Sequence, residues 1–232
     1  MNIINTKSLA ETIDNLNETF FYKQTLTKTQ KEQAAKWISG RQGLPGAYWN
    51  MFAPTENDYR HGIRLFTGEW ITSGAATGHI LGEEASRALL LLNLPDKSIK
   101  NSLSNAASGL FSALKRAYDT NPVVYKSMGY YCCGKCSVAF WRNINAGGLD
   151  HHEKRLSDGM KYLKSMRDSD GKWRRFPFYY TLLALIDIDM TSAREELRYA
   201  SGVCDKLIKR TPARDKYSLR KREIAQRVLE KC

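Results

Sequence analysis

Three cysteines lie close together and are the side chains in this chain best suited to chemistry. They are Cys132, Cys133 and Cys136, and the last two have the Cys-x-x-Cys spacing shared by metal sites and redox-active dithiols. Neighbouring thiols make a poor disulfide framework, and the chain's five cysteines are an odd number, so we expect them to be reduced. The sequence therefore predicts thiols in a reducing, cytoplasmic setting.

The histidines that follow these cysteines do not complete a metal site. His151 and His152 come fifteen and sixteen residues after Cys136, but two adjacent imidazoles cannot easily point at one ion. A second Cys-x-x-Cys, or two histidines with three residues between them, would be typical of zinc, and the sequence has neither. Zinc held by Cys133 and Cys136, and a thiolate activated by Lys135, stay as alternatives. We expect small buried thiols on an inner helix, without a metal or other cofactor.

A second candidate for chemistry is a row of polar side chains on one helical face. His79 and Glu83 are four residues apart, and Arg87 extends the row by another turn. A carboxylate can orient an imidazole and tune it near neutral pH, so His79 and Glu83 are candidates for general acid-base catalysis. The same spacing also fits a row of ion pairs on an exposed helix, which is the simpler interpretation.

Aromatic and basic residues are concentrated around positions 173–180. Arg174 and Arg175 stand just before an expected helix start, where free backbone N–H groups also favour an anion. The aromatic side chains that follow could line a cavity or pack in a core. The candidate ligand-binding residues are Arg174, Arg175, Phe178, Tyr179, Tyr180 and Trp141.

The composition is that of a basic globular protein. Its formal net charge is +12, and 42% of its residues are hydrophobic, which is enough for an ordinary core. Such a charge favours an anionic partner, although the basic residues are spread along the chain and also fit a solvated surface. No apolar run is long enough to cross a bilayer and the first residues do not resemble a secretory leader, so we expect no membrane contact.

The basic run at residues 220–222 is expected to be the solvated face of a closing amphipathic helix. The apolar stripe of that helix would consist of Leu219, Ile224, Ala225 and Val228. No helix-turn-helix, zinc-finger or RNA-binding signature accompanies the run, so nucleic acid is not the partner we expect.

Helices must position these side chains, because apolar residues recur at helical spacing along almost the whole chain. Residues 80–92 and 178–188 are apolar on most of their circumference, which predicts two inner helices surrounded by others. Only residues 123–131 could be extended, and helix-ending turns are expected at residues 121–122 and 211–212. We predict one all-helical domain spanning residues 1–232.

Two glycine turns repeat one pattern. Residues 37–48 and 162–173 both read aromatic, aliphatic, three residues, a long polar side chain, three residues, glycine, one residue, aromatic. The polar residue is Gln42 in the first copy and Arg167 in the second. In such a unit a helix ends, the polar side chain bonds the freed carbonyl groups, and the glycine permits a tight reversal.

This spacing resembles the glutamine-tryptophan repeat of squalene and terpene cyclases, the α/α-toroid proteins to which protein prenyltransferases are related. The resemblance is best over residues 159–188 and departs from the family pattern at Arg167, where the family prefers glutamine. It implies an α/α-toroid or an incomplete ring of helical hairpins, and a HEAT-like helical array is the alternative. The cyclases' Asp-x-Asp-Asp motif is missing, since residues 187–189 only approach it, so cyclase chemistry is not expected.

The leading functional hypothesis is a toroid-like protein that binds a small, partly apolar ligand, which could be anionic, in a central cleft. Whether it also catalyses a reaction stays open at this stage. The alternative is a non-catalytic helical scaffold that binds another protein or, less readily, nucleic acid.

Overall fold

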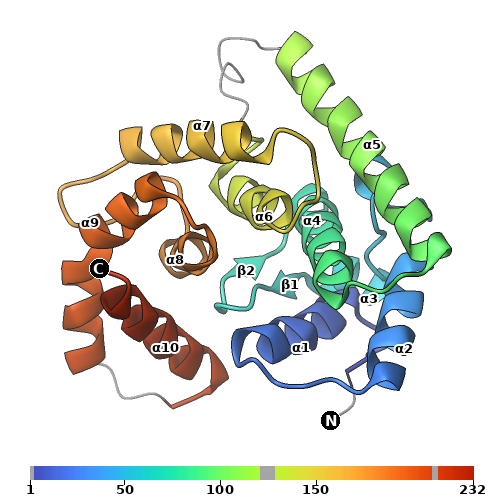
Figure 1. The fold of residues 1–232 in the computed structure, drawn as a ribbon, viewed down its shortest axis with the longest axis horizontal. Helices are drawn as coiled ribbons and strands as arrows, with labels where there is room; N and C mark the ends of the chain where they lie inside the picture. Colours follow the sequence, from blue (N-terminus) through green and yellow to red (C-terminus); the bar gives the residue numbers. More distant parts are fainter. Residues whose placement is uncertain (1–2, 121–128, 211–213) are drawn as a thin grey trace.

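Ten α-helices make up nearly all of the regular structure in the computed structural model, which describes residues 3–120, 129–210 and 214–232 (Figure 1). The predicted all-helical class is confirmed. In chain order the elements are α1 (Leu9–Phe21), α2 (Lys28–Ser39), the 3-10 turn η1 (Tyr48–Asn50), α3 (Glu56–His61), β1 (Ile63–Arg64), β2 (Trp70–Ile71), α4 (Gly74–Leu92), α5 (Lys97–Thr120), α6 (Gly134–Asn145), α7 (His152–Ser165), α8 (Phe178–Asp187), α9 (Thr191–Arg210) and α10 (Lys216–Glu230).

Five of these helices, α1, α4, α6, α8 and α10, follow one another around a ring (Figure 1). Along this ring α1 packs on α4, α4 on α6, α6 on α8, and α8 on α10. The remaining long helices lie outside it, where α2 packs on α4, α7 on α6, and α9 on α8 and α10. The chain therefore alternates between inner and outer positions, as a ring of helical hairpins does.

α10 closes the ring against α1 through buried ion pairs. Arg220 donates to Asp14 Oδ1 at 2.7 Å and to Glu18 Oε2 at 2.5 Å. It is only 1% exposed, so the solvated basic face predicted for the start of α10 is wrong for this residue. Leu219, expected in the apolar stripe, is 54% exposed instead. The reason is helical spacing, because Arg220 lies four residues before Ile224 and shares its buried face.

The two predicted inner helices are buried around their circumference. Every residue from 77 to 89 in α4 and from 180 to 186 in α8 is buried. The small residue Gly82 lets the side chain of Met51 approach α4, since a Cβ at this position would lie 3.0 Å from the Cβ of Met51. The prediction of inner helices is confirmed over these two ranges, whereas Leu91 and Asp187 near the helix ends are exposed.

Local capping signals begin several of the helices. Ser8 accepts from the backbone N–H of Glu11 at the start of α1, and capping boxes begin α2, α3 and α10. Asp58 in the first turn of α3 also accepts from Ser8 Oγ at 2.6 Å and from the backbone N–H of Leu9 at 2.9 Å. A single carboxylate thereby fixes the start of α1 against α3.

The two glycine turns share a positive φ at the glycine but differ in the residues that close them, since Phe52 and not Tyr48 pairs with Gln42. Each follows an outer helix, α2 or α7, and Gly46 and Gly171 have φ angles of 87° and 78°, which favour glycine. Gln42 pairs through its backbone with Phe52, and Arg167 pairs with Trp173, each as an isolated β-bridge. The turns lead to different places, because residues 171–177 enter α8 directly, whereas η1, α3 and a β-hairpin precede α4.

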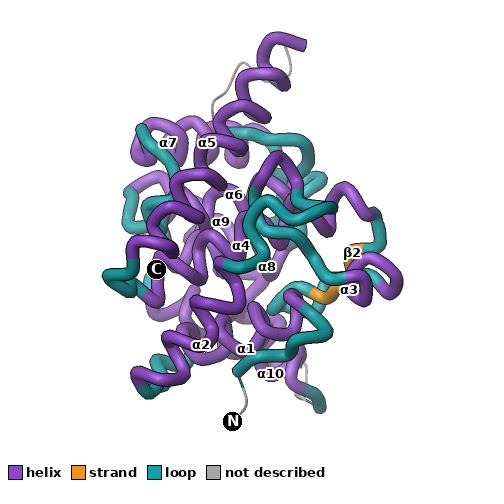
Figure 2. The backbone as a smooth tube through the Cα atoms, turned by 90° about the vertical axis from the view of Figure 1, so that its right-hand side faces the viewer, coloured by secondary structure: helices purple, strands orange, loops and turns teal. Residues whose placement is uncertain are grey.

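The β-hairpin is a small departure from the all-helical prediction. β1 and β2 pair antiparallel with Ile63 opposite Ile71, and strands of two residues are too short to show a period in the sequence. Figure 2 places these strands with α3 at one end of the molecule. The segment predicted as extended, 123–131, falls mostly outside the described residues, as does the turn at 211–212. No described helix is long and apolar enough to cross a membrane.

Candidate functional site

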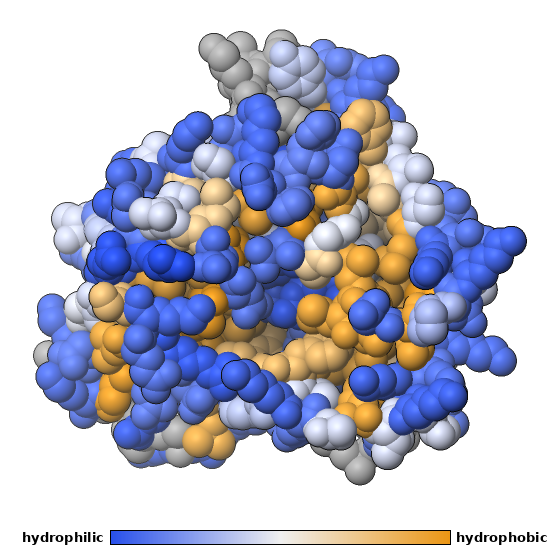
Figure 3. All heavy atoms as spheres, viewed as in Figure 1, coloured by the Kyte–Doolittle hydropathy of each residue, from blue (hydrophilic) through white to orange (hydrophobic). Residues whose placement is uncertain are grey.

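A cleft of about 590 Å³ opens in the middle of the ring. Figure 3 shows it as a hollow with hydrophilic residues at its bottom and hydrophobic residues around them. Every ring helix contributes to it, and so does the loop of the β-hairpin. The lining residues are Asn17, Phe20, Phe21, Tyr22, Lys23, Phe66, Arg87, Arg142, Leu183, Ile186, Asp187, Glu223, Arg227, Glu230 and Lys231.

The floor of the cleft is a polar network that joins α1, α4, α6 and α8. Asn17 Oδ1 accepts from Arg87 Nη1 at 2.8 Å and from Arg142 Nη2 at 3.3 Å. Arg142 Nε also lies 3.1 Å from Glu84 Oε1, although it is too poorly aligned for a hydrogen bond. Arg87 reaches outward, and its Nη2 donates to Asp187 Oδ2 at 3.2 Å. One amide oxygen thus holds two guanidinium groups together.

Glu84 is the buried carboxylate that accompanies these arginines. It accepts from Tyr180 Oη at 2.5 Å and from Asn17 Nδ2 at 3.2 Å. Burial raises the pKa of Glu84, but Arg142 and Arg87 outweigh burial, so this pKa is lowered from its usual value. Burial, together with Glu84, raises the pKa of Tyr180 well above its ordinary value. At neutral pH Glu84 is therefore ionised and Tyr180 is neutral.

Arg142 has two buried donor atoms, Nε beside Glu84 and Nη1, without an aligned hydrogen bond in the described part of the chain. Its Nη1 is buried and has no hydrogen-bond partner among the described residues. Burying a donor without a partner costs roughly 1–3 kcal/mol. In addition, the buried charged groups of the floor are two guanidinium groups and one carboxylate. Asp187, the other carboxylate beside these arginines, is 37% exposed at the rim and is not counted among them. The floor therefore carries unmatched donors, and its buried groups have one positive charge in excess, which Asp187 balances only from the rim.

The residues above this floor are partly apolar and partly charged. The apolar members are Phe20, Phe21, Phe66, Leu183 and Ile186, and the charged members at the rim are Lys23, Glu223, Arg227, Glu230 and Lys231. Some rim cations are already engaged, since Arg227 Nη1 donates to the backbone carbonyl of Phe21 at 2.9 Å and Lys231 Nζ donates to that of Ile186 at 2.6 Å. A molecule in the cleft would meet hydrocarbon side chains and a basic floor.

The ligand-binding residues predicted from the sequence do not line this cleft. Tyr180 lies behind the floor as a partner of Glu84, and Trp141 is fully buried and donates to the carbonyl of Gly129 at 2.5 Å. Phe178 and Tyr179 are half-buried near the start of α8. The other two, Arg174 and Arg175, are exposed before that helix.

The row of His79, Glu83 and Arg87 is buried, with exposures of 1%, 0% and 8%. The simpler interpretation of that spacing, an exposed row of ion pairs, is therefore wrong. Arg87 belongs to the cleft floor, but His79 lies between α4 and α6, close to Cys132 and Cys136. The structure thus places Arg87 at the cleft and His79 at the cysteines, at two positions along the same helix.

The cysteine segment begins α6 beside His79. The thiols of Cys132 and Cys136, and after them the backbone N–H groups of Cys136 and Lys135, favour the thiolate of Cys133 and lower its pKa to about 2. The same thiol neighbours, together with burial, raise the pKa of Cys136. His151 and His152 lie on the exposed start of α7 and are not part of this group. The expectation of a buried thiol holds for Cys136 but not for Cys132, which is exposed.

Sequence reasoning missed Asn17 and Arg142 in the cleft floor, and it placed Arg87 only in a helical row with His79 and Glu83. Asn17, Arg87 and Arg142 are more than fifty residues apart from one another, and only the closed ring brings them together. A signal was present, because an arginine that follows Phe140 and Trp141 in an apolar helix is costly to bury unless it has a partner. No family model, no curated protein and no solved structure matches this chain.

Proposed function

We propose that the protein binds a small, partly apolar, anionic molecule in the cleft at the middle of the ring. The observation that carries this proposal is the buried, unpartnered Nη1 of Arg142, which lies in the floor of a cleft with an excess of buried positive charge. A carboxylate or phosphate oxygen of the ligand would accept from this group. Such a contact would satisfy the donor and balance the charge together.

The size and lining of the cleft support a small-molecule ligand over a macromolecule. A volume of about 590 Å³ lies within the usual range for small-molecule sites. Guanidinium groups suit planar or tetrahedral oxyanions, because several donors point at one group. Three phenylalanines in the lining supply apolar contact area for the rest of the molecule.

The ring of hairpins also agrees with what the α/α-toroid resemblance implies, namely a ligand at the centre. We include membership of that fold group in the proposal, together with a cytoplasmic location supported by five free thiols. The alternative, a scaffold that binds another protein, would be supported by a large apolar surface patch. The cleft favours the small ligand, and we propose binding without assigning a reaction.

Thermal melts with simple anions test the proposal. Inorganic phosphate, pyrophosphate and citrate, each compared with chloride at equal ionic strength, are the probes. At one hundred times its dissociation constant a bound anion stabilises the folded state by about 2.7 kcal/mol. We expect at least one probe to raise the melting temperature of the wild type and to lose this effect in Arg87→Gln.

Arg60→Gln is the matched control, because Arg60 is exposed on α3 and does not line the cleft. It should respond to the anions as the wild type does. An equal response of both variants would mean that the anions act on the general basic surface. No response of the wild type to any probe, together with no molecule retained in native mass spectrometry of freshly purified protein, would contradict the proposal.

A further inference from the structure

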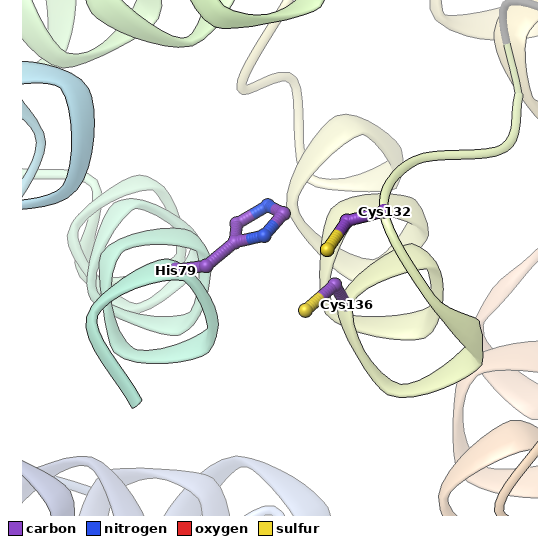
Figure 4. Close-up of side chains that lie close together, drawn as sticks. All are labelled: His79, Cys132 and Cys136. Carbon is purple, nitrogen blue, oxygen red and sulfur yellow. The ribbon is translucent and has the colours of Figure 1, made fainter. Parts of the chain in front are cut away.

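A second polar cluster lies between α4 and α6, away from the cleft lining. It consists of His79 on α4, Cys132 just before α6, and Cys136 in the first turn of α6. One ring nitrogen of His79 and the two sulfur atoms lie within 4.8 Å of one another. Figure 4 shows the imidazole pointing from α4 toward both sulfur atoms. Two sulfurs and one imidazole nitrogen are thus gathered from two neighbouring ring helices.

The imidazole of His79 is held firmly in this direction. Tyr48 stacks on it with ring centroids 4.5 Å apart and an angle of 11°, and Tyr131 meets it edge-on at the same distance. Glu83 Oε1 lies 3.3 Å from its Nε2, and Asn143 Nδ2 donates to Glu83 Oε2 at 2.6 Å. Because Glu83 faces Nε2, Nδ1 is the nitrogen left for the sulfur side.

His79 lacks the partners that a buried imidazole normally has. The side chain is 1% exposed, and neither ring nitrogen has an aligned hydrogen bond in the described part of the chain. Burying polar groups without partners is unfavourable. An ion bound by Nδ1 would remove this cost on one side and would leave Nε2–H to donate to Glu83 on the other.

We propose that His79, Cys132 and Cys136 bind a zinc ion. Two thiolates and a neutral imidazole form a ligand set that suits zinc, with Zn–S distances of about 2.3 Å and Zn–N distances of about 2.0–2.1 Å. The two thiolates balance the charge of Zn²⁺, so two thiol protons are released on binding. Glu83, oriented by Asn143, holds the imidazole from behind, as carboxylates commonly do at zinc sites.

The observed separations need only small adjustments to become a coordination site. In a tetrahedral zinc site the ligand atoms lie roughly 3.5–3.8 Å from one another, which follows from the bond lengths above. Cys132 is exposed. Its φ of 61° is a backbone conformation that few residues adopt, and this conformation directs its side chain toward His79 and Cys136. Side-chain rotation at this exposed position can bring the three ligand atoms together.

Cys133 is not part of the ligand set, although it separates the two cysteines that are. The group within 4.8 Å does not include it, although its sulfur interacts with the thiols of Cys132 and Cys136 as well as with the backbone N–H groups at the start of α6. The fourth position of the ion is therefore left to water or to an external ligand. A site with three protein ligands and one open position is the arrangement of catalytic zinc centres.

This site is independent of the anion-binding cleft. Its ligands join α4 to the start of α6, and neither the histidine nor the cysteines line the cleft. Loss of zinc binding and loss of anion binding are therefore separate outcomes. The sequence expectation of no metal rested on the histidines at 151 and 152, whereas the histidine that completes the group lies 53 residues before Cys132.

Elemental analysis and cobalt substitution test the proposal. Protein purified under reducing conditions from zinc-supplemented cells, without chelators, should contain about one zinc per chain. After chelation, added Co²⁺ should give a thiolate-to-cobalt charge-transfer band. Cys132→Ser should lose the zinc while it keeps its helical circular dichroism, because this residue is exposed and its replacement leaves no cavity. His79→Gln should lose the zinc as well.

The neighbouring Cys133→Ser and the distant Cys204→Ser are matched controls, and both should keep the zinc. Wild-type protein with neither zinc nor a cobalt band would overturn the proposal. Loss of zinc in Cys133→Ser would overturn the proposed ligand set. A disulfide between Cys133 and Cys136 in protein purified without reductant, with no metal uptake after the disulfide is reduced, would show a redox pair instead.

Discussion

Helix α4 carries two buried polar clusters that differ in how well the protein satisfies them. Toward the cleft, Glu84 accepts from Tyr180 and Asn17 and lies beside Arg142. Toward α6, Glu83 accepts from Asn143, but its Oε1 and both nitrogens of His79 lack an aligned partner. Burial is equal in the two clusters. What differs is whether protein groups complete the polar contacts.

This difference distinguishes a cluster that stabilises the fold from a cluster that binds a ligand. The cluster around Glu84 joins four ring helices without outside help, so it contributes to the stability of the protein alone. The cluster around His79 is complete only when an ion occupies it, so its contribution depends on zinc. Arg142 belongs to the cluster around Glu84. Its Nη1 has no hydrogen-bond partner among the described residues, so this cluster too contains a polar group that a ligand could satisfy.

The largest effect is expected from Arg142→Met, which leaves Glu84 buried without its cationic neighbour. Breaking a buried ion pair by removing one partner costs about 3–5 kcal/mol. Urea unfolding of the variant, monitored by circular dichroism, should show this loss of free energy of unfolding. The double variant Arg142→Met/Glu84→Gln should recover most of the loss, because a neutral amide needs no counter-charge.

The matching change in the other cluster should have a smaller effect in zinc-free protein. His79→Gln removes a ring whose nitrogens hold no hydrogen bond, so the loss should come from its contacts with Tyr48 and Tyr131 and amount to about 1–2 kcal/mol. If Arg142→Met and His79→Gln cost the same in zinc-free protein, the contrast between the two clusters does not exist.

The second effect is that of zinc on stability. Free zinc at one hundred times its dissociation constant should stabilise the folded state by about 2.7 kcal/mol, or roughly 5–10 °C in melting temperature for a chain of this size. Scanning calorimetry with and without a chelator measures it. Cys132→Ser should melt at one temperature under both conditions, and a chelator effect that survives this substitution would place the metal elsewhere.

The sequence predicted the helices better than it predicted the sites. Residues 80–92 and 178–188 are predicted as inner helices because their apolar residues cover most of the circumference, a property that the local sequence expresses. Arg220 was missed as a buried residue, because its partners Asp14 and Glu18 lie two hundred residues earlier. A charge is buried or solvated according to contacts that periodicity does not contain.

The zinc site illustrates the same limit. Cys133 and Cys136 have the familiar spacing, yet the structure groups Cys136 with Cys132, because backbone conformation and not spacing sets the direction of each side chain. His79 was considered only with its helical neighbours Glu83 and Arg87. Nothing in the sequence brings it to the cysteines until α4 packs on α6.

A smaller effect concerns pH and the cluster around Glu84. The pKa of Glu84 is lowered in the folded protein from its usual 4.5, since its arginine neighbours outweigh burial. Its stabilising contribution is therefore present above pH 4.5 and is lost as the pH falls through the folded-state pKa. Cys132→Ser is the background for this measurement, so that release of zinc by acid does not contribute.

In that background, the difference in unfolding free energy between the protein that keeps Glu84 and the Glu84→Gln variant should begin to shrink below pH 4.5, where the unfolded chain takes up a proton. It should be lost once the pH falls through the lower folded-state pKa, where Glu84 is uncharged like glutamine. Urea unfolding from pH 7 to pH 3 measures this difference. A difference that stays constant across the range would mean that Glu84 is already protonated at neutral pH, and its role as the partner of Arg142 would be wrong.

The smallest effect on stability, and the one that bears most directly on the cleft, is expected from Asp187→Asn. Asp187 is 37% exposed, so losing its ion pair with Arg87 should cost less than about 1 kcal/mol. The same change removes the carboxylate that competes with an incoming anion for Arg87. The affinity for the anion found in the melts should therefore rise roughly threefold, which corresponds to a free-energy change of less than about 1 kcal/mol. Asp189→Asn is the matched control, because Asp189 is 87% exposed, pairs with Arg194 and does not line the cleft. Isothermal titration of both variants decides the matter. Equal affinities in the two would mean that Arg87 does not meet the anion, and the floor of the cleft would then serve only to hold the ring together.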